Sequence, residues 1–348
     1  MAPHPADVNP DETTGPWLDC ALAAIPNGRV AVFGDFCLDA YWSIDPDESE
    51  LSVETGLPVR RVRHQRYGLG GAGNIVANLV ALGVGRVQAV GLVGPDLFGR
   101  LMTDMLGELG VDCRGLLQCD EDWQTIVYAK PLVGDVEQSR IDFGGFGGLT
   151  PADVDALAAG LDRAAGRSDV LVLNQQLTWG TCTPAMIERI NAIVAAHPGC
   201  RFIADSRHRP ELFIGCALKL NARQASRFVG GRRPVGEDLP AERASDCAAE
   251  AHKRTGKPVF LTRGADGLIV ADEAGVEVIP AIEILGQVDP VGAGDTGVAA
   301  VAAVLASGGD PFTAGRLANL AASVTVRKLR TTGTAGPEEI RQAASLRD

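Results

Sequence analysis

The sequence lacks the features that mark several large classes of protein. None of its eight cysteines forms a Cys-x-x-Cys pair, and its five histidines are scattered without the spacing of a zinc site. No apolar run approaches the roughly 20 residues that a membrane span needs. Basic residues form no long run, and the formal net charge is −12. We therefore expect a cytoplasmic protein in a reducing compartment, with a small-molecule partner rather than nucleic acid or a membrane.

The start of the chain differs in composition from the rest. The first 15 residues, MAPHPADVNPDETTG, contain neither a basic flank nor an apolar stretch of the kind that targeting segments carry. We expect residues 1–27 to be a flexible tail. The remainder, residues 28–348, is long enough to bury a large core and is expected to form one domain.

From Arg29 onward, β-branched runs alternate with Ala- and Leu-rich stretches of helical length. The helical stretches include residues 74–82 and 97–109, and the expected strands are RVAVFGD, RVQAVGLVG, DVLVLN, CRFIAD and PVFLTRG. Such alternation is typical of strands that are buried on both faces. It predicts an α/β fold in which a doubly wound, mainly parallel sheet carries helices on both faces.

Two stretches interrupt that alternation. PVRRVRHQRY alternates apolar and charged residues, whereas QTIVYAKPL and EQSRIDF together resemble a hairpin. Both patterns predict an antiparallel sheet with one face open to water. We expect a small inserted β-sheet lid over a cleft, in segments of about 41–67 and 111–147, with the glycines of residues 144–148 as a flexible return.

The most informative segment is residues 288–306, VDPVGAGDTGVAAVAAVLA, in which a glycine-rich turn runs directly into a long helix. Small residues at Gly292, Ala293 and Gly294 let the backbone approach a ligand, and the unpaired N–H groups of a helix start attract anions. Asp295 lies in the first turn, where its carboxylate could accept a proton from an attacking hydroxyl. The alternative is that Asp295 only caps the helix.

A second glycine-rich turn opens the helix that follows Leu69, in LGGAGNIVANLVALG. Gly68, Gly70 and Gly73 also spell a Gly-x-Gly-x-x-Gly pattern, which raises the alternative of a nicotinamide oxidoreductase. A dinucleotide fingerprint should follow a buried apolar strand, and the preceding RRVRHQRY is too polar for one. The pattern therefore argues only weakly for a dinucleotide.

Two acids follow the first expected strand, in GDFCLDAYW. Asp35 and Asp39 should lie beyond the carboxyl edge of the sheet, which is where open α/β sheets bind ligands. We expect one of them to contact the substrate. The alternative for Asp35 is a structural role in a cap or turn.

These segments together resemble the PfkB (ribokinase) family of carbohydrate kinases. DPVGAGD is similar to the second signature of the family, and the turn at Gly70, Gly71 and Asn74 is similar to the first. GDFCLDAYW, LPVRRV, EQSRIDF and ANLAASVTVRKLRTTGTA resemble in particular the kinase half of the bifunctional heptose-7-phosphate kinase/heptose-1-phosphate adenylyltransferase. Because the chain stops at Asp348, we expect only the phosphorylation step.

The resemblance implies a role for each matching residue. It makes Asp295 the catalytic base and places the phosphate on Gly292, Ala293 and Gly294. The sugar would be bound by Asp35, Asp39, Gly70, Gly71, Asn74 and Arg140. ATP would be bound by Asn221, Gln224, Thr262, Gly264, Gly267 and Asn319. Mg²⁺ would accompany ATP, and a monovalent cation, expected to be K⁺, would lie near Asp289, Val291 and residues 330–333. A homodimer through the lid is expected by the same analogy.

Two positions depart from the family pattern. Gln224 stands where a glutamate usually helps to order magnesium, and residues 174–180 lack the acid and the lysine of the heptose-kinase subgroup. The first departure supports the alternative of a ribokinase-fold nucleotide- or sugar-binding protein with weak or no phosphoryl transfer. The second leaves the sugar open. Arginines at positions 60, 61, 63 and 66 could clamp an anionic sugar or could simply face water.

Overall fold

The computed structural model describes residues 15–45, 50–119, 123–134, 136–145, 148–178, 180–231 and 240–345. Its main sheet has nine strands in the order β16-β15-β14-β13-β12-β11-β1-β6-β7. The strands from β7 to β14 are parallel, while β15 and β16 are antiparallel additions. The bounds are β1 Arg29–Gly34, β6 Arg86–Val93, β7 Asp112–Gln118, β11 Val170–Gln175, β12 Arg201–Ser206, β13 Ala217–Asn221, β14 Val259–Thr262, β15 Leu268–Asp272 and β16 Gly275–Ile279.

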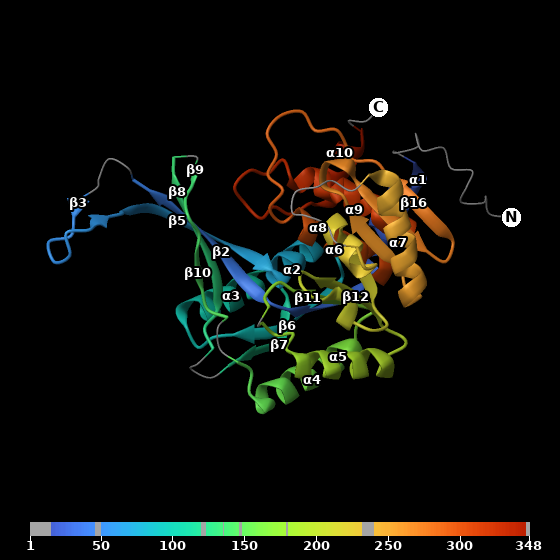
Figure 1. The fold of residues 1–348 in the computed structure, drawn as a ribbon, viewed down its shortest axis with the longest axis horizontal. Helices are drawn as coiled ribbons and strands as arrows, with labels where there is room; N and C mark the ends of the chain where they lie inside the picture. Colours follow the sequence, from blue (N-terminus) through green and yellow to red (C-terminus); the bar gives the residue numbers. More distant parts are fainter. Residues whose placement is uncertain are drawn as a thin grey trace.

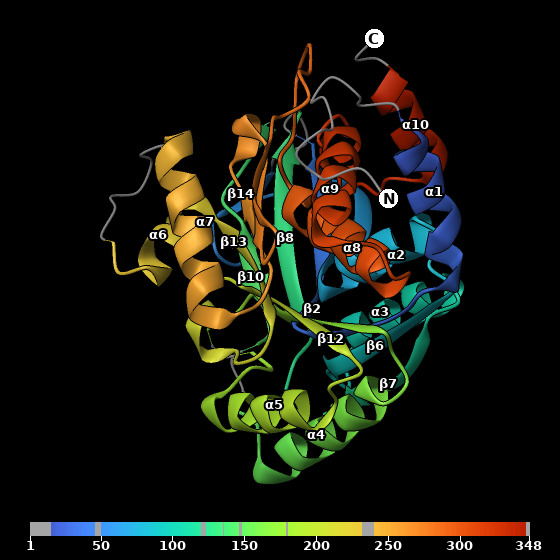
Figure 2. The ribbon, with the colours of Figure 1, turned by 90° about the vertical axis from the view of Figure 1, so that its right-hand side faces the viewer.

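Helices cover both faces of this sheet, as the buried strands require (Figure 2). In β1, Val30 and Val32 pack into the core on one face, and Ala31 and Phe33 pack into the core on the other. The first face carries α1 Pro16–Ala24, α2 Ala72–Ala81, α3 Leu97–Glu108, α8 Ala293–Ala306, α9 Pro311–Thr325 and α10 Pro337–Ser345. The second carries α4 Pro151–Ala165, α5 Pro184–Ala196, α6 Ala222–Phe228 and α7 Ala241–Thr255. The predicted α/β fold is confirmed.

A smaller sheet projects from one end of the molecule (Figure 1). Its strand order is β10-β8-β2-β5, with β9 paired to β8, and the hairpin β3-β4 lies beyond it. The bounds are β2 Phe36–Ile44, β3 Glu50–Leu51, β4 Pro58–Val59, β5 Val62–Gly71, β8 Ile126–Val133, β9 Val136–Glu137 and β10 Ile141–Phe143. β2 pairs antiparallel with β5 but parallel with β8. We call this sheet the lid.

The lid boundaries differ from those expected from the alternation of the sequence. Strand β7, within the expected segment 111–147, is the edge strand of the main sheet and pairs with β6. Conversely, β2 and β5 extend the lid to Phe36 and Gly71. The expected lid segment therefore began too early, since residues 112–118 belong to the main sheet. Asp112–Gln118 is only partly buried, as an edge strand is.

Candidate active site

Helix α8 begins at the carboxyl edge of the main sheet, beside the lid. Gly292 caps it in the left-handed conformation, with φ at 80°. A Cβ atom at Gly292 would lie 2.8 Å from Asn74 Nδ2. Both facts require glycine at this position. Any other residue would be strained at this positive φ, and its Cβ atom would collide with the side-chain amide of Asn74.

Two backbone donors stay open at the start of α8. The N–H group of Ala293 donates to the carbonyl of Pro290 at 3.2 Å. Among the described residues, the N–H groups of Gly294 and Asp295 have no acceptor. These two donors lie at the positive end of a 14-residue helix, so they can bind an anion. The expected anion site is therefore centred on Gly294 and Asp295, while the amide of Ala293 is already paired.

The carboxylate of Asp295 lies beside this anion site. Its Oδ2 accepts a hydrogen bond from Asn74 Nδ2 at 2.9 Å. The pKa of Asp295 is raised to about 7, mainly by burial and also by the negative charges of Asp205 and Asp39, although the hydrogen bond from Asn74 and the ammonium of Lys219 act to lower it. A carboxylate with a pKa near 7 can accept a proton at neutral pH, as a general base must.

Asn74 is held in place by hydrogen bonds from Asn78, one turn later on α2. Asn78 Nδ2 donates to the Asn74 carbonyl at 2.9 Å and to Asn74 Oδ1 at 3.2 Å. Both side chains are buried. The pair orients the amide of Asn74 so that its N–H group points to Asp295. Asn78 was not predicted, although its four-residue spacing from Asn74 on a helix could have indicated the contact.

Asp35 lies between β1 and β2 and serves as an acceptor for the loop that follows β11. Its Oδ2 accepts the N–H groups of Gln176 and Leu177, each at 2.8 Å, and its Oδ1 accepts the N–H and Oγ1 of Thr181 at 2.7 and 2.8 Å. A Cβ atom at Gly180 would lie 2.1 Å from Oδ1, so the loop passes directly over the carboxylate. These four hydrogen bonds give Asp35 a structural role instead of the expected contact with the sugar.

Asp39 lies on the lid strand β2 and is paired within the lid. Its Oδ1 is 2.7 Å from Lys130 Nζ, and the exposed fractions of the two side chains are 8% and 9%. Lys130 also lies 3.4 Å from the hydroxyl of Tyr41. The negative charge of Asp39 is among the causes that raise the pKa of Asp295. The second carboxyl oxygen of Asp39 can accept a hydroxyl group of a ligand between the lid and α8.

The glycines at the end of β5 let the chain pass close to both acids. A Cβ atom at Gly70 would lie 2.9 Å from Asp39 Oδ2, and one at Gly71 would lie 2.6 Å from the carbonyl of Asp35. Gly71 also has a positive φ of 54°. The turn thus brings Asn74, at the start of α2, next to the acid-bearing strand β2.

Basic side chains stack on the tyrosines of the lid. The guanidinium of Arg66 and the ammonium of Lys130 lie 4.7 and 4.9 Å from the ring centroid of Tyr41. Arg140 lies 4.4 Å from the ring centroid of Tyr128 and also pairs with Asp142 at 2.6 Å. Stacking keeps these cations on the lid, where Lys130 is also paired with Asp39 and Arg140 with Asp142.

The residues predicted to bind nucleotide lie at the carboxyl ends of β13 and β14. Asn221 and Thr262 are register partners across these strands. Gly264 and Gly267 both have positive φ, and a Cβ atom at Gly267 would lie 2.2 Å from the Ile279 carbonyl. Asn319 on α9 donates to the Pro280 carbonyl at 2.8 Å, which ties the segment after β16 to the helix.

Gln224 forms a capping box with Asn221 at the start of α6. Gln224 Oε1 accepts the N–H of Asn221 at 2.7 Å, and Asn221 Oδ1 accepts the N–H of Gln224 at 2.9 Å. Its Nε2 donates to the carbonyls of Ser206 at 2.8 Å and Arg207 at 3.3 Å. A glutamate could not make the last two bonds. The side chain therefore joins β12 to α6 and does not fit the expected role in ordering magnesium.

Asp289 cross-links two loops near the anion site. Its Oδ1 accepts the N–H of Val291 at 3.0 Å, and its Oδ2 accepts the N–H of Arg330 at 2.8 Å. Arg330 has a φ of 57°, and its carbonyl accepts a hydrogen bond from Arg66 on the lid. The cross-link brings together the two backbone segments expected to surround a monovalent cation. In the described part of the chain, no group of three or more His, Cys, Asp or Glu side chains could hold a metal ion.

The structure places one further charged pair at this edge, which no motif had indicated. Lys219 Nζ on β13 lies 3.1 Å from Asp205 Oδ1 on β12, and the side chains are 13% and 7% exposed. Asp205 Oδ2 also accepts Asn174 Nδ2 at 3.3 Å. A Cβ atom at Gly294 would lie only 3.0 Å from the ammonium of Lys219. The lysine therefore lies against the anion site.

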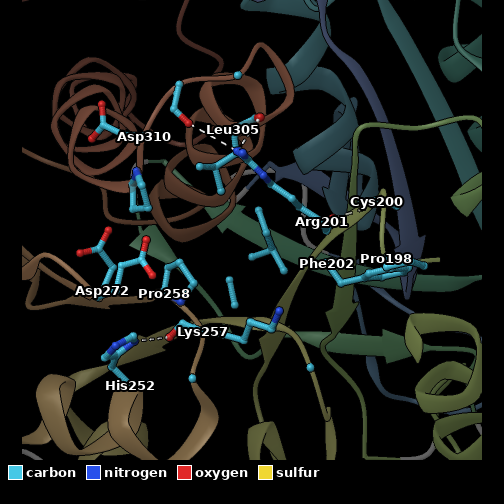
Figure 3. A pocket seen from close by; sticks show the side chains of 18 residues that line it. Pro198, Cys200, Arg201, Phe202, His252, Lys257, Pro258, Asp272, Leu305 and Asp310 are labelled. Atoms are coloured by element: carbon cyan, nitrogen blue, oxygen red, sulfur yellow. Dashed lines mark hydrogen bonds between the residues drawn. The ribbon is translucent and has the colours of Figure 1, made fainter. Parts of the chain in front are cut away.

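A separate hollow of about 520 Å³ lies at the opposite, amino edge of the sheet (Figure 3). Its wall includes Arg201, whose guanidinium donates to the Leu305 carbonyl at 3.1 Å and to the Gly309 carbonyl at 3.4 Å. Lys257 lines the same hollow. Because Asp295 and Asp205 lie at the carboxyl edge, this hollow is not part of the candidate active site.

Comparison with known proteins is consistent with this arrangement. The model of the pfkB family of carbohydrate kinases matches residues 28–158 and 216–337. The chain is 34% identical over 324 residues to the bifunctional protein HldE of Caulobacter sp. strain K31, covering 90% of this chain and 63% of that protein. It is 31% identical over 312 residues to the D-beta-D-heptose 7-phosphate kinase of Bordetella bronchiseptica, covering 88% and 93%. The chain thus spans less than two thirds of its bifunctional relatives.

Solved structures with the same fold include two kinases at lower identity. Phosphofructokinase-2 from Escherichia coli, in its tetrameric inhibited form, aligns with a TM-score of 0.72 at 17% identity, covering 92% of this chain and 99% of that one. Ribokinase from Arabidopsis thaliana, complexed with ribose and ATP, aligns with a TM-score of 0.65 at 20% identity, covering 91% and 98%. Within the described residues, no helix has the length and apolar character needed to cross a membrane.

Proposed function

Because this chain belongs to the pfkB family of carbohydrate kinases, we propose that it phosphorylates a hydroxyl group of a sugar or sugar phosphate with ATP. One observation carries the proposal. The carboxylate of Asp295 lies beside the open N–H groups of Gly294 and Asp295, at the positive end of α8. A base next to an anion site is what transfer of a phosphoryl group to a hydroxyl requires.

In this mechanism each polar group of the site has one task. Asp295 takes the proton from the attacking hydroxyl, and Asn74 holds its carboxylate in place. The N–H groups of Gly294 and Asp295 bind the transferring phosphoryl group. The second oxygen of Asp39 accepts a hydroxyl of the sugar, and the lid closes over the site to exclude water.

ATP, Mg²⁺ and K⁺ complete the proposed site. The adenine nucleotide would lie along the ends of β13 and β14, near Asn221, Thr262, Gly264 and Gly267, with Asn319 bordering its loop. When bound, Mg²⁺ would neutralise charge on the phosphates, and Gln224 would not hold it because its amide is paired with Asn221 and the Ser206 carbonyl. K⁺ would bind between the loops that Asp289 cross-links.

The sugar is proposed to carry an anionic group. Arg66 lies on the ring of Tyr41, whereas the neighbouring Lys130 and Arg140 are also paired with Asp39 and Asp142. A phosphate on the substrate would be attracted to Arg66. The relative named D-beta-D-heptose 7-phosphate kinase supports a heptose 7-phosphate as the first substrate to test.

We also propose a cytoplasmic homodimer that pairs through the lid. Leu51, Val53, Leu57 and Val136 are exposed on its strands and turns, and Val53 is 97% exposed. Apolar side chains gathered on a projecting sheet are costly to leave in water, and a second copy would bury them. Sedimentation of the protein, compared with a Val53→Glu and Leu57→Glu double variant, tests this assembly.

The deciding experiment measures ADP release from Mg-ATP with K⁺ present, over a panel of free and phosphorylated sugars. We expect one anionic sugar to raise the rate and Asp295→Asn to abolish that increase while ATP still binds. Binding of ATP and sugar without ADP release would overturn the proposal. The chain would then be a ribokinase-fold protein that binds nucleotide or sugar without transferring phosphate, the alternative that Gln224 supports in the sequence.

A further inference from the structure

Lys219 is held at the anion site by contacts that leave most of its hydrogen-bonding capacity open. One N–H of its ammonium goes to Asp205 Oδ1 at 3.1 Å, and an ammonium has three. The ammonium lies 3.0 Å from the point where Gly294 would carry a Cβ atom. The absence of a side chain at Gly294 therefore makes room for this cation next to the N–H groups of Gly294 and Asp295.

A purely structural ion pair would not explain this placement. Asp205 already accepts a hydrogen bond from Asn174, and the pair is almost buried, so its desolvation costs much of what the charges gain. A largely buried lysine next to Gly294, whose N–H group is open, instead adds a full positive charge to the anion site.

Resting on the proposed function, we infer that Lys219 is a further catalytic residue whose ammonium binds the terminal phosphate of ATP beside the N–H groups of Gly294 and Asp295. During transfer, the bond from the terminal phosphorus to the bridging oxygen of ADP breaks, and a bond to the sugar oxygen forms. The hydroxyl proton goes to Asp295. Lys219 keeps its proton throughout and stabilises the charge on the transferring group, while Asp205 holds it in position.

The test compares Lys219→Met, which keeps the length of the side chain, with Lys219→Arg, which keeps the charge. Lys257→Met, at the hollow on the amino edge (Figure 3), is the matched control. Turnover is measured with the best sugar of the panel. The dissociation constants of ADP and of the non-hydrolysable analogue AMP-PNP are measured by calorimetry.

For Lys219→Met we expect kcat to fall about a hundredfold, as when one donor of an oxyanion site is removed. The affinity for AMP-PNP should fall about tenfold relative to that for ADP, which corresponds to losing one charge-assisted contact to the terminal phosphate. Lys219→Arg should recover much of both, and Lys257→Met should change neither.

An unchanged ratio of AMP-PNP to ADP affinity in Lys219→Met overturns the inference, whatever happens to turnover. If the unmodified protein releases no ADP with any sugar, the proposed function fails, yet the affinity ratio still decides whether Lys219 contacts the terminal phosphate. Should Lys219→Met fail to fold, Lys219→Gln decides in its place, because it removes the charge but leaves a polar group beside Asp205. The same loss of AMP-PNP affinity is expected.

Discussion

Two carboxylates at the same edge of the sheet, Asp35 and Asp295, have opposite surroundings. Asp35 accepts four hydrogen bonds from the loop after β11 and is 1% exposed. Asp295 accepts one side-chain bond, from Asn74, and burial raises its pKa to about 7. A carboxylate whose acceptor sites are filled by the donors of one loop holds structure, whereas one left with open acceptor sites can take a proton. For both acids the sequence left a structural role open, and their hydrogen bonds favour that role for Asp35 and a catalytic role for Asp295.

The largest effect should come from removing the base. Asp295→Asn keeps the shape of the side chain but cannot take the proton, so we expect kcat to fall about a thousandfold. Steady-state kinetics with the best sugar measures this, and calorimetry checks that ATP still binds. Asp169→Asn is the control, because the Asp169 carboxylate binds the guanidinium and the backbone N–H of Arg29 at the amino edge of the sheet. A fall in kcat of less than tenfold would show that Asp295 only caps α8.

Asp35→Asn should instead affect stability. Asparagine would direct an N–H group at the donors of Gln176, Leu177 or Thr181, and we expect a loss of about 3 kcal/mol in the free energy of unfolding. Urea denaturation measures it. Stability equal to that of the parent, together with a raised KM for sugar, would return Asp35 to the role of a sugar ligand.

Gln224→Glu tests whether the amide at this position is structural. A carboxylate cannot donate to the carbonyls of Ser206 and Arg207 and would repel them, so we expect a loss of about 2 kcal/mol. Chemical denaturation is the measurement, with Gln342→Glu, at an exposed position on helix α10, as the control. A stable Gln224→Glu variant with stronger dependence on Mg²⁺ would show that the site accepts the acid of the family pattern.

The pH dependence of kcat/KM should follow the titration of Asp295. The base must be deprotonated to act, so kcat/KM should be level above pH 7 and fall about tenfold per pH unit below it. Burial sets most of this pKa, and the groups that adjust it are Asn74, Asp205, Lys219 and Asp39. An acidic limb with a midpoint near 4 would mean that Asp295 is not desolvated in the free enzyme.

The smallest effect concerns the stability of the Asp295→Asn variant. Since the folded protein raises the pKa of Asp295 from 3.8 to about 7, the folded state binds more protons than the unfolded state, and stability falls as pH rises through that window. Allowing for partial exposure, Asp295→Asn should be more stable by about 1 kcal/mol at pH 8. The gain should vanish near pH 4, and thermal unfolding at both values measures it. A gain that does not depend on pH would contradict the assigned cause.

Most of the fold could be predicted because its strands are short β-branched runs in regular alternation with helices. The runs beginning at Arg29, Arg86 and Arg201 are all strands of the main sheet. β7 falls within the segment expected for the lid but is the edge strand of the main sheet. The antiparallel pair β15 and β16 carries no pattern that distinguishes it from the parallel strands.

The site could be predicted where its residues are contiguous. Gly292, Gly294 and Asp295 share one turn, so their juxtaposition is local. Lys219 is separated from Asp295 by several elements, and only the ordering of strands at the sheet edge brings them together. The structural role of Gln224 also depends on carbonyls of another strand. Such long-range contacts have no signature in a single sequence.

A mechanical property follows from the way in which the lid joins the core. Asp35 is the single residue between core strand β1 and lid strand β2, and its carbonyl accepts the N–H of Ala72, where the chain leaves the lid for α2. Two further crossings join the lid to the core, one before β8 and one after β10. If the lid turns about the point where Asp35 and Ala72 meet, its distant tip would move through a much larger arc than the strand ends near the core, so a small shift at the catalytic end would become a large one at the tip.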